Sequence, residues 1–199
     1  MAKTASSEKG VEFSQNFEEI WVQTEWMAGL VKAQFHDKRI FKKPFLPQFP
    51  PPVDIEKKYD LITVSSLSPH KNFKTFLCAL VLLDQKVARP ISVLAVLDSN
   101  LNSKEVVRPK LTNIKLDVYT KMSREELFRS YQQSKIAIVT SSLESFCLPI
   151  YEAVHFNLKV LSLDTPFARE CESVRFFYKS NTDVDLSMAI NNIVNLKLS

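Results

Sequence analysis

The sequence predicts an α/β fold in which a parallel sheet is covered by helices on both faces. After residue 58, short β-branched and apolar runs alternate with segments of helical period. The strand-like runs are apolar at nearly every position, as is typical of strands buried on both faces. A length of 199 residues fits one such domain with an appendage. We therefore expect a Rossmann-like domain preceded by a smaller segment.

Residues 1–52 are predicted to form that segment, and residues 53–199 the domain. Residues 1–10 are small and polar, which favours disorder. Residues 23–35 fit best to a helix, whereas the type of the apolar run before them stays open. Five prolines within residues 44–52 cannot continue a helix or a central strand, so we expect an extended linker.

Strands and helices alternate through the predicted domain. Strands are expected at residues 59–66, 91–97, 114–119, 135–140, 160–163 and 174–178. Helices are expected at residues 72–86, from Ser123, near residues 150–156 and from Asp183. Ser123 and Glu126 have the spacing of a capping box, which marks a helix start.

Composition excludes several classes of protein. The only glycines are Gly10 and Gly29, so neither a P-loop nor a G-x-G-x-x-G dinucleotide turn is present. The three cysteines and three histidines lack ligand spacing, so neither a disulfide framework nor a metal site is expected. A formal net charge of +4 fits an anionic ligand but is low for a nucleic-acid-binding protein.

No targeting or membrane-spanning segment is apparent, and we expect a cytoplasmic protein. The start of the chain has no apolar core of a signal peptide, and the longest apolar run, residues 76–83, is too short to span a bilayer. Residues 32–45 mix basic and aromatic side chains, which fits peripheral contact with the inner face of an anionic membrane. We favour the alternative, a solvated linker whose aromatic rings pack on the domain.

Ligands of parallel sheets bind beyond the carboxyl ends of the strands, which here selects the loops at residues 65–71, 141–149 and 164–170. The first loop brings Ser66, His70 and Lys71 to a helix start, where an anion is favoured. The alternative is that Lys71 is a solvated surface lysine and that Asn72 is an ordinary N-cap.

The second loop contains two carboxylates. Pro149 is suited to the first position of a helix, which would leave Glu144 in the loop and place Glu152 on the first turn. Both could then face one pocket and bind hydroxyl pairs. Alternatively, Glu152 complements the helix dipole and Glu144 is solvated. The D-x-D at residues 183–185 is a metal-binding motif in some enzymes. At the start of a predicted helix it more often indicates capping of the helix N-terminus.

These two loops resemble the carboxyl-terminal, nucleotide-sugar-binding domain of GT-B retaining glycosyltransferases of family 4. That family has a Gly-Arg four residues before a Lys, and later E-G-F-G-L-P-x-x-E-A. The resemblance covers roughly residues 59–194, and residues 20–45 resemble the end of a preceding domain. The matching residues are Lys71, Asn72, Glu144, Phe146, Leu148, Pro149, Glu152 and Ala153.

The resemblance implies roles for these residues in binding a nucleoside diphosphate sugar without a metal ion or another cofactor. Lys71 would contact the donor diphosphate, Glu144 the sugar hydroxyls and Glu152 the ribose, with Lys71 and Glu144 counted as catalytic. The loop amides would hold sugar or phosphate oxygens. These amides are those of Phe146, Cys147 and Leu148.

The chain also departs from the family pattern. Ser65 and Ser66 stand where Gly-Arg is usual, which removes a diphosphate clamp that His70 could replace in part. Ser145 and Cys147 replace two glycines, and Asn157 replaces the glycine after the following helix.

The function that this resemblance implies is transfer of a hexose or deoxyhexose to a glycan or lipid-linked acceptor, in bacterial cell-surface polysaccharide biosynthesis. GT-B enzymes work between two Rossmann-like domains, and residues 1–52 are too few for the first. We therefore expect a donor-binding half that needs a partner chain or self-association. The alternative is a noncatalytic nucleotide-sugar-binding subunit that completes or regulates a partner.

Overall fold

The computed structural model describes residues 17–98 and 106–196 and divides the chain into two compact units. The disorder predicted for residues 1–10 lies outside the described residues. Unit 1 is Met1–Pro47 and unit 2 is Gln48–Ser199, which moves the predicted boundary from residue 52 to residue 47. Residues 48–52 belong to unit 2 because they pack on it. The Phe49 ring lies 5.0 Å from the His155 ring, and His155 Nε2 is 2.7 Å from the Pro50 carbonyl oxygen.

Unit 1 consists of two parallel strands joined by a helix. Strand β1 (Glu19–Val22) pairs with β2 (Arg39–Lys42), and α2 (Glu25–Gln34) connects them. The helix predicted over residues 23–35 is thus confirmed, and the Thr24 side chain caps it by accepting a hydrogen bond from the Met27 amide. The sequence did not predict strand β2, because its four residues, RIFK, are too few and too basic to show an apolar alternation.

Unit 2 is built on a parallel six-stranded sheet, which confirms the predicted fold class. Its strand order is β5-β4-β3-β6-β7-β8. All six strands were predicted. Five of them begin and end within one residue of the predicted bounds, and β8 ends at the predicted residue but begins two residues later. The strands are β3 (Tyr59–Ser66), β4 (Ile91–Asp98), β5 (Ile114–Thr120), β6 (Ser134–Val139), β7 (Lys159–Leu163) and β8 (Phe176–Tyr178).

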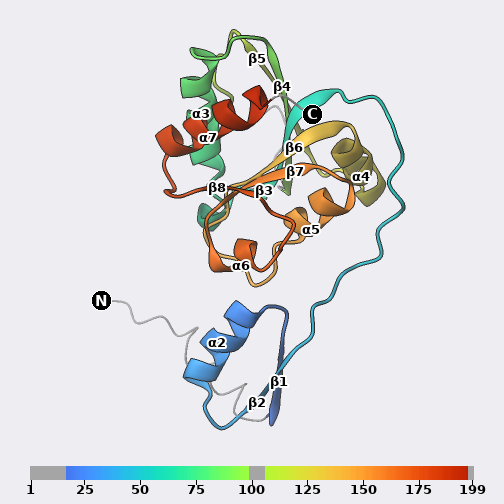
Figure 1. Cartoon of the computed structure of the whole chain (residues 1–199), viewed down its shortest axis with the longest axis vertical. Helices are drawn as coiled ribbons and strands as arrows, with labels where there is room; N and C mark the ends of the chain where they lie inside the picture. The colour runs from blue at the N-terminus through green and yellow to red at the C-terminus, as the bar shows by residue number, and fades with distance from the viewer. Residues whose placement is uncertain (1–16, 99–105, 197–199) are drawn as a thin grey trace. The chain divides into compact units, whose positions relative to one another are not determined.

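Helices cover both faces of this sheet (Figure 1). On one face α3 (Phe73–Asp84) packs against α7 (Asp183–Asn195), and on the other lie α4 (Arg124–Gln132) and α5 (Leu148–His155). The short helices η1 (Pro69–Lys71) and α6 (Pro166–Arg169) follow β3 and β7. The apolar side chains between sheet and helices, Phe76, Leu80 and Leu83 among them, are fully buried.

Two helix starts show how local chemistry sets the boundaries. The predicted capping box of α4 is present, because Ser123 and Glu126 exchange side-chain and backbone hydrogen bonds. In α7 the N-cap is Thr182 rather than Asp183, and the Asp185 carboxylate accepts hydrogen bonds from the amides of residues 179 and 180. The D-x-D pair therefore organises a helix start.

Among residues 17–98 and 106–196, three residues other than glycine adopt left-handed backbone conformations: Asn72 (φ 54°), Lys121 (φ 57°) and Asn157 (φ 61°). Glycine normally occupies such positions because it has no Cβ. Asn157 directly follows the end of α5, which is where a helix most often needs a left-handed residue. Asparagine tolerates this conformation better than most residues, so its presence in place of the usual glycine is compatible with the fold.

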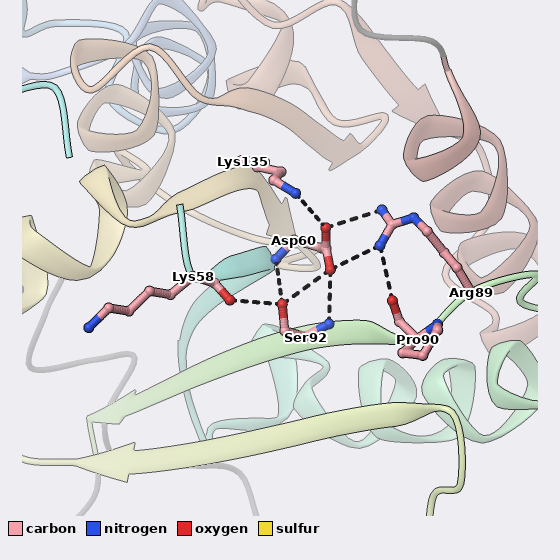
Figure 2. A network of polar contacts seen from close by, with 6 residues as sticks. All are labelled: Lys58, Asp60, Arg89, Pro90, Ser92 and Lys135. Atoms are coloured by element: carbon pink, nitrogen blue, oxygen red, sulfur yellow. Dashed lines mark hydrogen bonds and ion pairs between the residues drawn. The ribbon is translucent and has the colours of Figure 1, made fainter. Parts of the chain in front are cut away.

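Figure 2 shows a polar network that joins three strands at their amino ends, opposite the loops selected from the sequence. The Asp60 carboxylate, at the start of β3, accepts hydrogen bonds from the Ser92 amide (3.0 Å), Arg89 (3.1 Å) and Lys135 (2.9 Å). Although burial alone would raise the pKa of Asp60, these partners hold it well below its ordinary value. The network thus cross-links β3, β4 and β6.

Candidate functional site

The sheet has one topological switch point, and two of the three selected loops meet there. From the central strand β3 the chain builds one side of the sheet through β4 and β5, then returns to β6 and builds the other side. The loops after β3 and β6 therefore diverge from adjacent strands, which in open α/β sheets creates the usual ligand crevice.

Hydrogen bonds join these two loops to each other. The Ser142 amide donates to the His70 carbonyl at 2.8 Å, and the Thr140 hydroxyl donates to the Lys71 carbonyl at 2.6 Å. The side-chain amide of Asn72 donates to the Thr140 carbonyl at 2.9 Å. Because these bonds satisfy carbonyls that no helix or strand uses, the two loops behave as one structural element.

Asn72 is the N-cap residue of α3, but it is not an ordinary one. Its side chain makes no capping hydrogen bond to α3, and its amide instead bridges the carbonyls of His70 and Thr140. The left-handed backbone of Asn72 turns its side chain toward the second loop rather than along the helix. Asn72 and Thr140 are therefore residues that shape the site, and spacing alone did not reveal either role.

Lys71 and Glu144 form an ion pair across the two loops, with Nζ and Oε1 2.5 Å apart. Their side chains are only 21% and 13% exposed, so neither is the solvated surface residue of the alternative interpretation. Partial burial strengthens a charge-assisted hydrogen bond, and it also means that each charge would need a replacement partner if the pair opened.

Glu152 is the fifth residue of α5, so it lies on the second turn and not on the first. Pro149 is correspondingly the second residue of the helix rather than the first. Since the influence of the helix dipole is concentrated in the first turn, capping of the dipole does not explain Glu152.

Glu152 is buried, with 5% of its surface exposed. Burial raises the pKa of Glu152, while the neighbouring Tyr131 hydroxyl and Arg124 act in the opposite direction. Burying a carboxylate is costly, and buried carboxylates with a shifted pKa concentrate at binding and catalytic sites.

The Cys147 thiol shows that these charged groups share one neighbourhood. Its pKa is raised to about 12, first by burial and then by Glu144, with Lys71 acting in the opposite direction and Glu152 adding a smaller increase. All three charges are therefore close enough to influence one sulfur atom. At that pKa the thiol stays protonated at neutral pH, so Cys147 is not a nucleophile.

The remaining predicted residues differ in how closely they join this cluster. Phe146 is buried and stacks on Tyr151 with ring centroids 4.4 Å apart, which holds the loop against α5. The Leu148 amide donates to the Phe146 carbonyl at 3.1 Å, so a ligand oxygen would have to displace that bond. Ser66 ends β3, half-buried, and accepts a hydrogen bond from the Ser68 amide, whereas the side chain of His70 is exposed.

The third selected loop satisfies its own charges. Arg169, on α6, makes two hydrogen bonds to Asp164, at 2.5 and 2.7 Å, and its guanidinium lies 5.1 Å from the centre of the Phe177 ring. In the described part of the chain, no hydrogen bond or ion pair joins these two side chains to Lys71 or Glu144, so the pair is not part of the site.

The described residues contain neither a candidate metal site nor a candidate membrane span. In that part of the chain, no group of three or more His, Cys, Asp or Glu side chains is arranged to hold a metal ion. Nor does any helix there have the length and apolar character to cross a membrane.

Residues 47–197 match the sequence model of a family described as glycosyl transferases group 1. The chain belongs to the group 1 glycosyl transferases. The family assignment agrees with the Rossmann-like parallel sheet of unit 2. No curated protein matches the sequence at a significant level.

Solved structures of longer glycosyltransferases share this fold. A pneumococcal O-GlcNAc transferase, GtfA, described in complex with UDP and GlcNAc, is 16% identical with a TM-score of 0.66, over 91% of this chain and 38% of that chain. TarM is 16% identical with a TM-score of 0.72, over 98% and 40%. A GtfA/B complex is 18% identical with a TM-score of 0.64, over 94% and 40%. Our chain thus spans about two fifths of the length of these relatives.

Proposed function

We propose that this chain is the donor-binding half of a retaining, family 4 type glycosyltransferase that uses a nucleoside diphosphate sugar. The observation that carries the proposal is the buried carboxylate of Glu152 next to the Lys71–Glu144 ion pair. Vicinal hydroxyls supply two donors to such a carboxylate, and a diphosphate supplies the anion that Lys71 would accept.

In this proposal each group has a separate part of the donor. Glu152 binds the ribose hydroxyls, Glu144 binds the hydroxyls of the sugar, and Lys71 stabilises the diphosphate as it leaves. The ion pair then opens on binding, because the phosphate replaces Glu144 as the partner of Lys71. Fixed positive charge supports departure of a diphosphate without a metal ion. Amides of residues 146–148 supply further donors.

The transferred group is a hexose or deoxyhexose, and the acceptor is a glycan or a lipid-linked molecule of a bacterial cell-surface polysaccharide, made on the cytoplasmic side. Structural relatives described with UDP and GlcNAc, or with UDP and α-GlcNAc-glycerol, support this class of donor. The chain spans about two fifths of those relatives, and one of them is described as a complex. A partner chain or a second copy would therefore complete the cleft.

The second candidate is a noncatalytic nucleotide-sugar-binding subunit. The observation in its favour is Ser66, a neutral residue at the end of β3 where related enzymes have an arginine. A site with one lysine and no arginine can still bind a donor, but it stabilises a leaving diphosphate less well. Both candidates predict that the chain binds a nucleotide sugar, so only an assay of sugar transfer distinguishes the enzyme from the noncatalytic subunit.

Calorimetric titration of the chain with UDP-, GDP-, ADP- and dTDP-sugars tests the proposal. We expect one sugar nucleotide to bind, and to bind equally well after a chelator is added. If none of the four classes binds, the proposed function is wrong.

Replacement of each carboxylate tests its assigned part. We expect Glu152→Gln to weaken every ribonucleotide ligand by about tenfold or more, since a charge-assisted hydrogen bond is lost. Glu144→Gln should weaken only ligands that carry the sugar. Glu56→Gln, at an exposed residue of the linker, is the matched control and should change neither. Equal loss of plain nucleoside diphosphate binding in both site variants would contradict the assignment.

A further inference from the structure

Tyr131 has a buried hydroxyl that the fold itself does not use. The residue is 1% exposed, and its hydroxyl has no hydrogen-bond partner of ordinary geometry among the described residues. The ring is held in place, because it stacks on Phe156 with centroids 6.1 Å apart and an interplanar angle of 20°. A buried hydroxyl without a partner costs free energy, so its presence on α4 calls for an explanation.

The Tyr131 ring on α4 stacks on Phe156, which lies one turn after Glu152 on α5, so the buried Tyr131 and Glu152 side chains share the interface between these helices. Tyr131 and Glu152 each alter the pKa of the other: burial and Glu152 raise that of Tyr131, and Tyr131 opposes the effect of burial on Glu152. The other described groups that face Glu152 are Arg124 on α4 and Cys147 in the loop before α5. Of these, Tyr131 is the neutral oxygen donor whose hydrogen is not engaged.

The number of acceptor sites on a carboxylate makes this proximity important. An ionised carboxylate has about four lone-pair positions, and a pair of ribose hydroxyls would use two of them. Ligand binding also excludes the remaining water, so a further donor from the protein becomes necessary. Tyr131 is placed to supply it with a small movement of either side chain.

We propose that Tyr131 is a positioning residue for Glu152, donating a hydrogen bond to the carboxylate in the nucleotide-bound state and orienting its free oxygen toward the ribose. This inference rests on the proposed role of Glu152 in binding the ribose. It adds to that role a specificity for ribonucleotides over 2′-deoxyribonucleotides that depends on a residue outside the E-x7-E segment.

The experiment compares Tyr131→Phe with the wild-type chain, since phenylalanine keeps the ring stacked on Phe156 and removes only the hydroxyl. The probes are UDP, GDP and ADP, each titrated beside its 2′-deoxy counterpart. We expect the ribonucleotide that binds to be weakened about three- to tenfold, the loss of one neutral hydrogen bond. The 2′-deoxy counterpart should be much less affected, so the ratio of the two affinities falls.

The pH profile gives a second readout that a purely structural role would not change. Tyr131 opposes the raised pKa of Glu152, so its removal should raise that pKa further. If the ionised carboxylate binds the ribose, affinity in the variant should decline at a higher pH than in the wild type as the solution is acidified. The wild-type chain gives the reference profile.

Tyr178→Phe is the matched control. The Tyr178 hydroxyl is also buried and lacks a partner in the described part of the chain, but it belongs to β8, which β7 separates from β6. Both variants should keep or slightly raise the midpoint of thermal unfolding, because each removes an unsatisfied polar group. Only Tyr131→Phe should change nucleotide binding.

The outcomes are distinguishable. Wild-type affinities in Tyr131→Phe, or equal losses for ribo- and deoxyribonucleotides with a lowered unfolding midpoint, would overturn the positioning role while leaving the proposed function in place. Absence of binding by the wild-type chain to all six nucleotides would overturn the proposed function, and this inference with it.

Discussion

Lys71 and Glu144 neutralise each other across two loops, and this pairing sets the residue-scale chemistry of the site. In the proposed function, this lysine exchanges its carboxylate partner for the diphosphate of the donor. The backbone of Lys71 is tied to the second loop, because its carbonyl accepts a hydrogen bond from the Thr140 hydroxyl. We therefore expect the Lys71 side chain to change partners without a change in its own backbone.

Lys71→Ala should weaken binding of a nucleoside diphosphate about ten- to a hundredfold, since one charge-assisted contact to phosphate is lost. Binding of the bare nucleoside should hardly change. Titration calorimetry with both ligands measures the contrast. Lys74→Ala removes an exposed lysine on the next helix and should leave both affinities as they are. Parallel losses of diphosphate and nucleoside in Lys71→Ala would show that Lys71 does not contact phosphate.

Lys121 gives a prediction about stability at the same scale. Its φ of 57° places a long side chain in the left-handed region, which costs about 1 kcal/mol for residues other than glycine. Lys121→Gly removes this strain, although it increases the entropy of the unfolded chain, so we expect a gain of up to about 1 kcal/mol. Urea unfolding measures it. Lys110→Gly, at an exposed position without a left-handed backbone, should instead be neutral or destabilising, and a similar gain there would contradict the strain argument.

At the scale of elements, buried carboxylates tie strands and helices together where backbone pairing cannot. The Asp84 carboxylate, at the end of α3, accepts hydrogen bonds from the amides of residues 112, 113 and 114, at 2.7 to 2.8 Å, and so fixes the start of β5. Asp60 does the same for the amino ends of β3, β4 and β6 (Figure 2). Such contacts hold neighbouring strands in register far from the loops of the site.

Asp60→Asn should lower the free energy of unfolding at pH 7 by about 1–3 kcal/mol, because charge-assisted hydrogen bonds to a buried acceptor are lost. The folded pKa of Asp60 lies below its unfolded value, so the ionised form stabilises the fold above about pH 4. That contribution disappears as the pH falls through the folded pKa. The difference between wild type and variant should therefore be largest near neutral pH and shrink in acid.

Urea unfolding at pH 7 and at pH 3 measures this dependence. Asp54→Asn, at an exposed residue of the linker, controls for the general effect of removing a negative charge and should change little at either pH. A difference between wild type and Asp60→Asn that grows toward acid would have the wrong sign for this network.

At the scale of the whole molecule, the proposed function gives this chain one wall of a cleft. Its relatives of known structure are about two and a half times as long, and the matched part includes unit 2 with all its site loops. Holding a donor and an acceptor in one cleft contributes about 7–11 kcal/mol to catalysis through proximity and orientation. A chain that binds only the donor would lack most of that contribution.

We therefore expect the purified chain to bind its donor and to transfer no sugar specifically to an acceptor. A transfer assay with oligosaccharide and lipid-linked acceptors, run on the chain alone and after addition of a co-purified partner, measures this. Activity that appears only on mixing is the expected result. Efficient transfer by the chain as a monomer would show that the half-enzyme interpretation is wrong.

The sequence by itself predicted the six strands and four main helices of unit 2, because residues buried on both faces of a sheet leave continuous apolar runs. It also predicted the switch-point loops and the carboxylates that they contain. The position of Glu152 on the second turn was missed, since helix starts depend on backbone geometry near Pro149 that spacing does not reveal. Strand β2 and helix α6 are too short to leave a periodic signal.

Only the tertiary structure decided which charges meet. Lys71 and Glu144 are far apart in the sequence, and nothing local distinguishes this pair from the exposed ion pairs of the chain. The same is true of Tyr131 and Glu152, which face each other only because α4 and α5 pack side by side on one face of the sheet. Periodicity records which face of an element is buried, whereas contacts between elements depend on strand order, and strand order follows from packing the whole sheet.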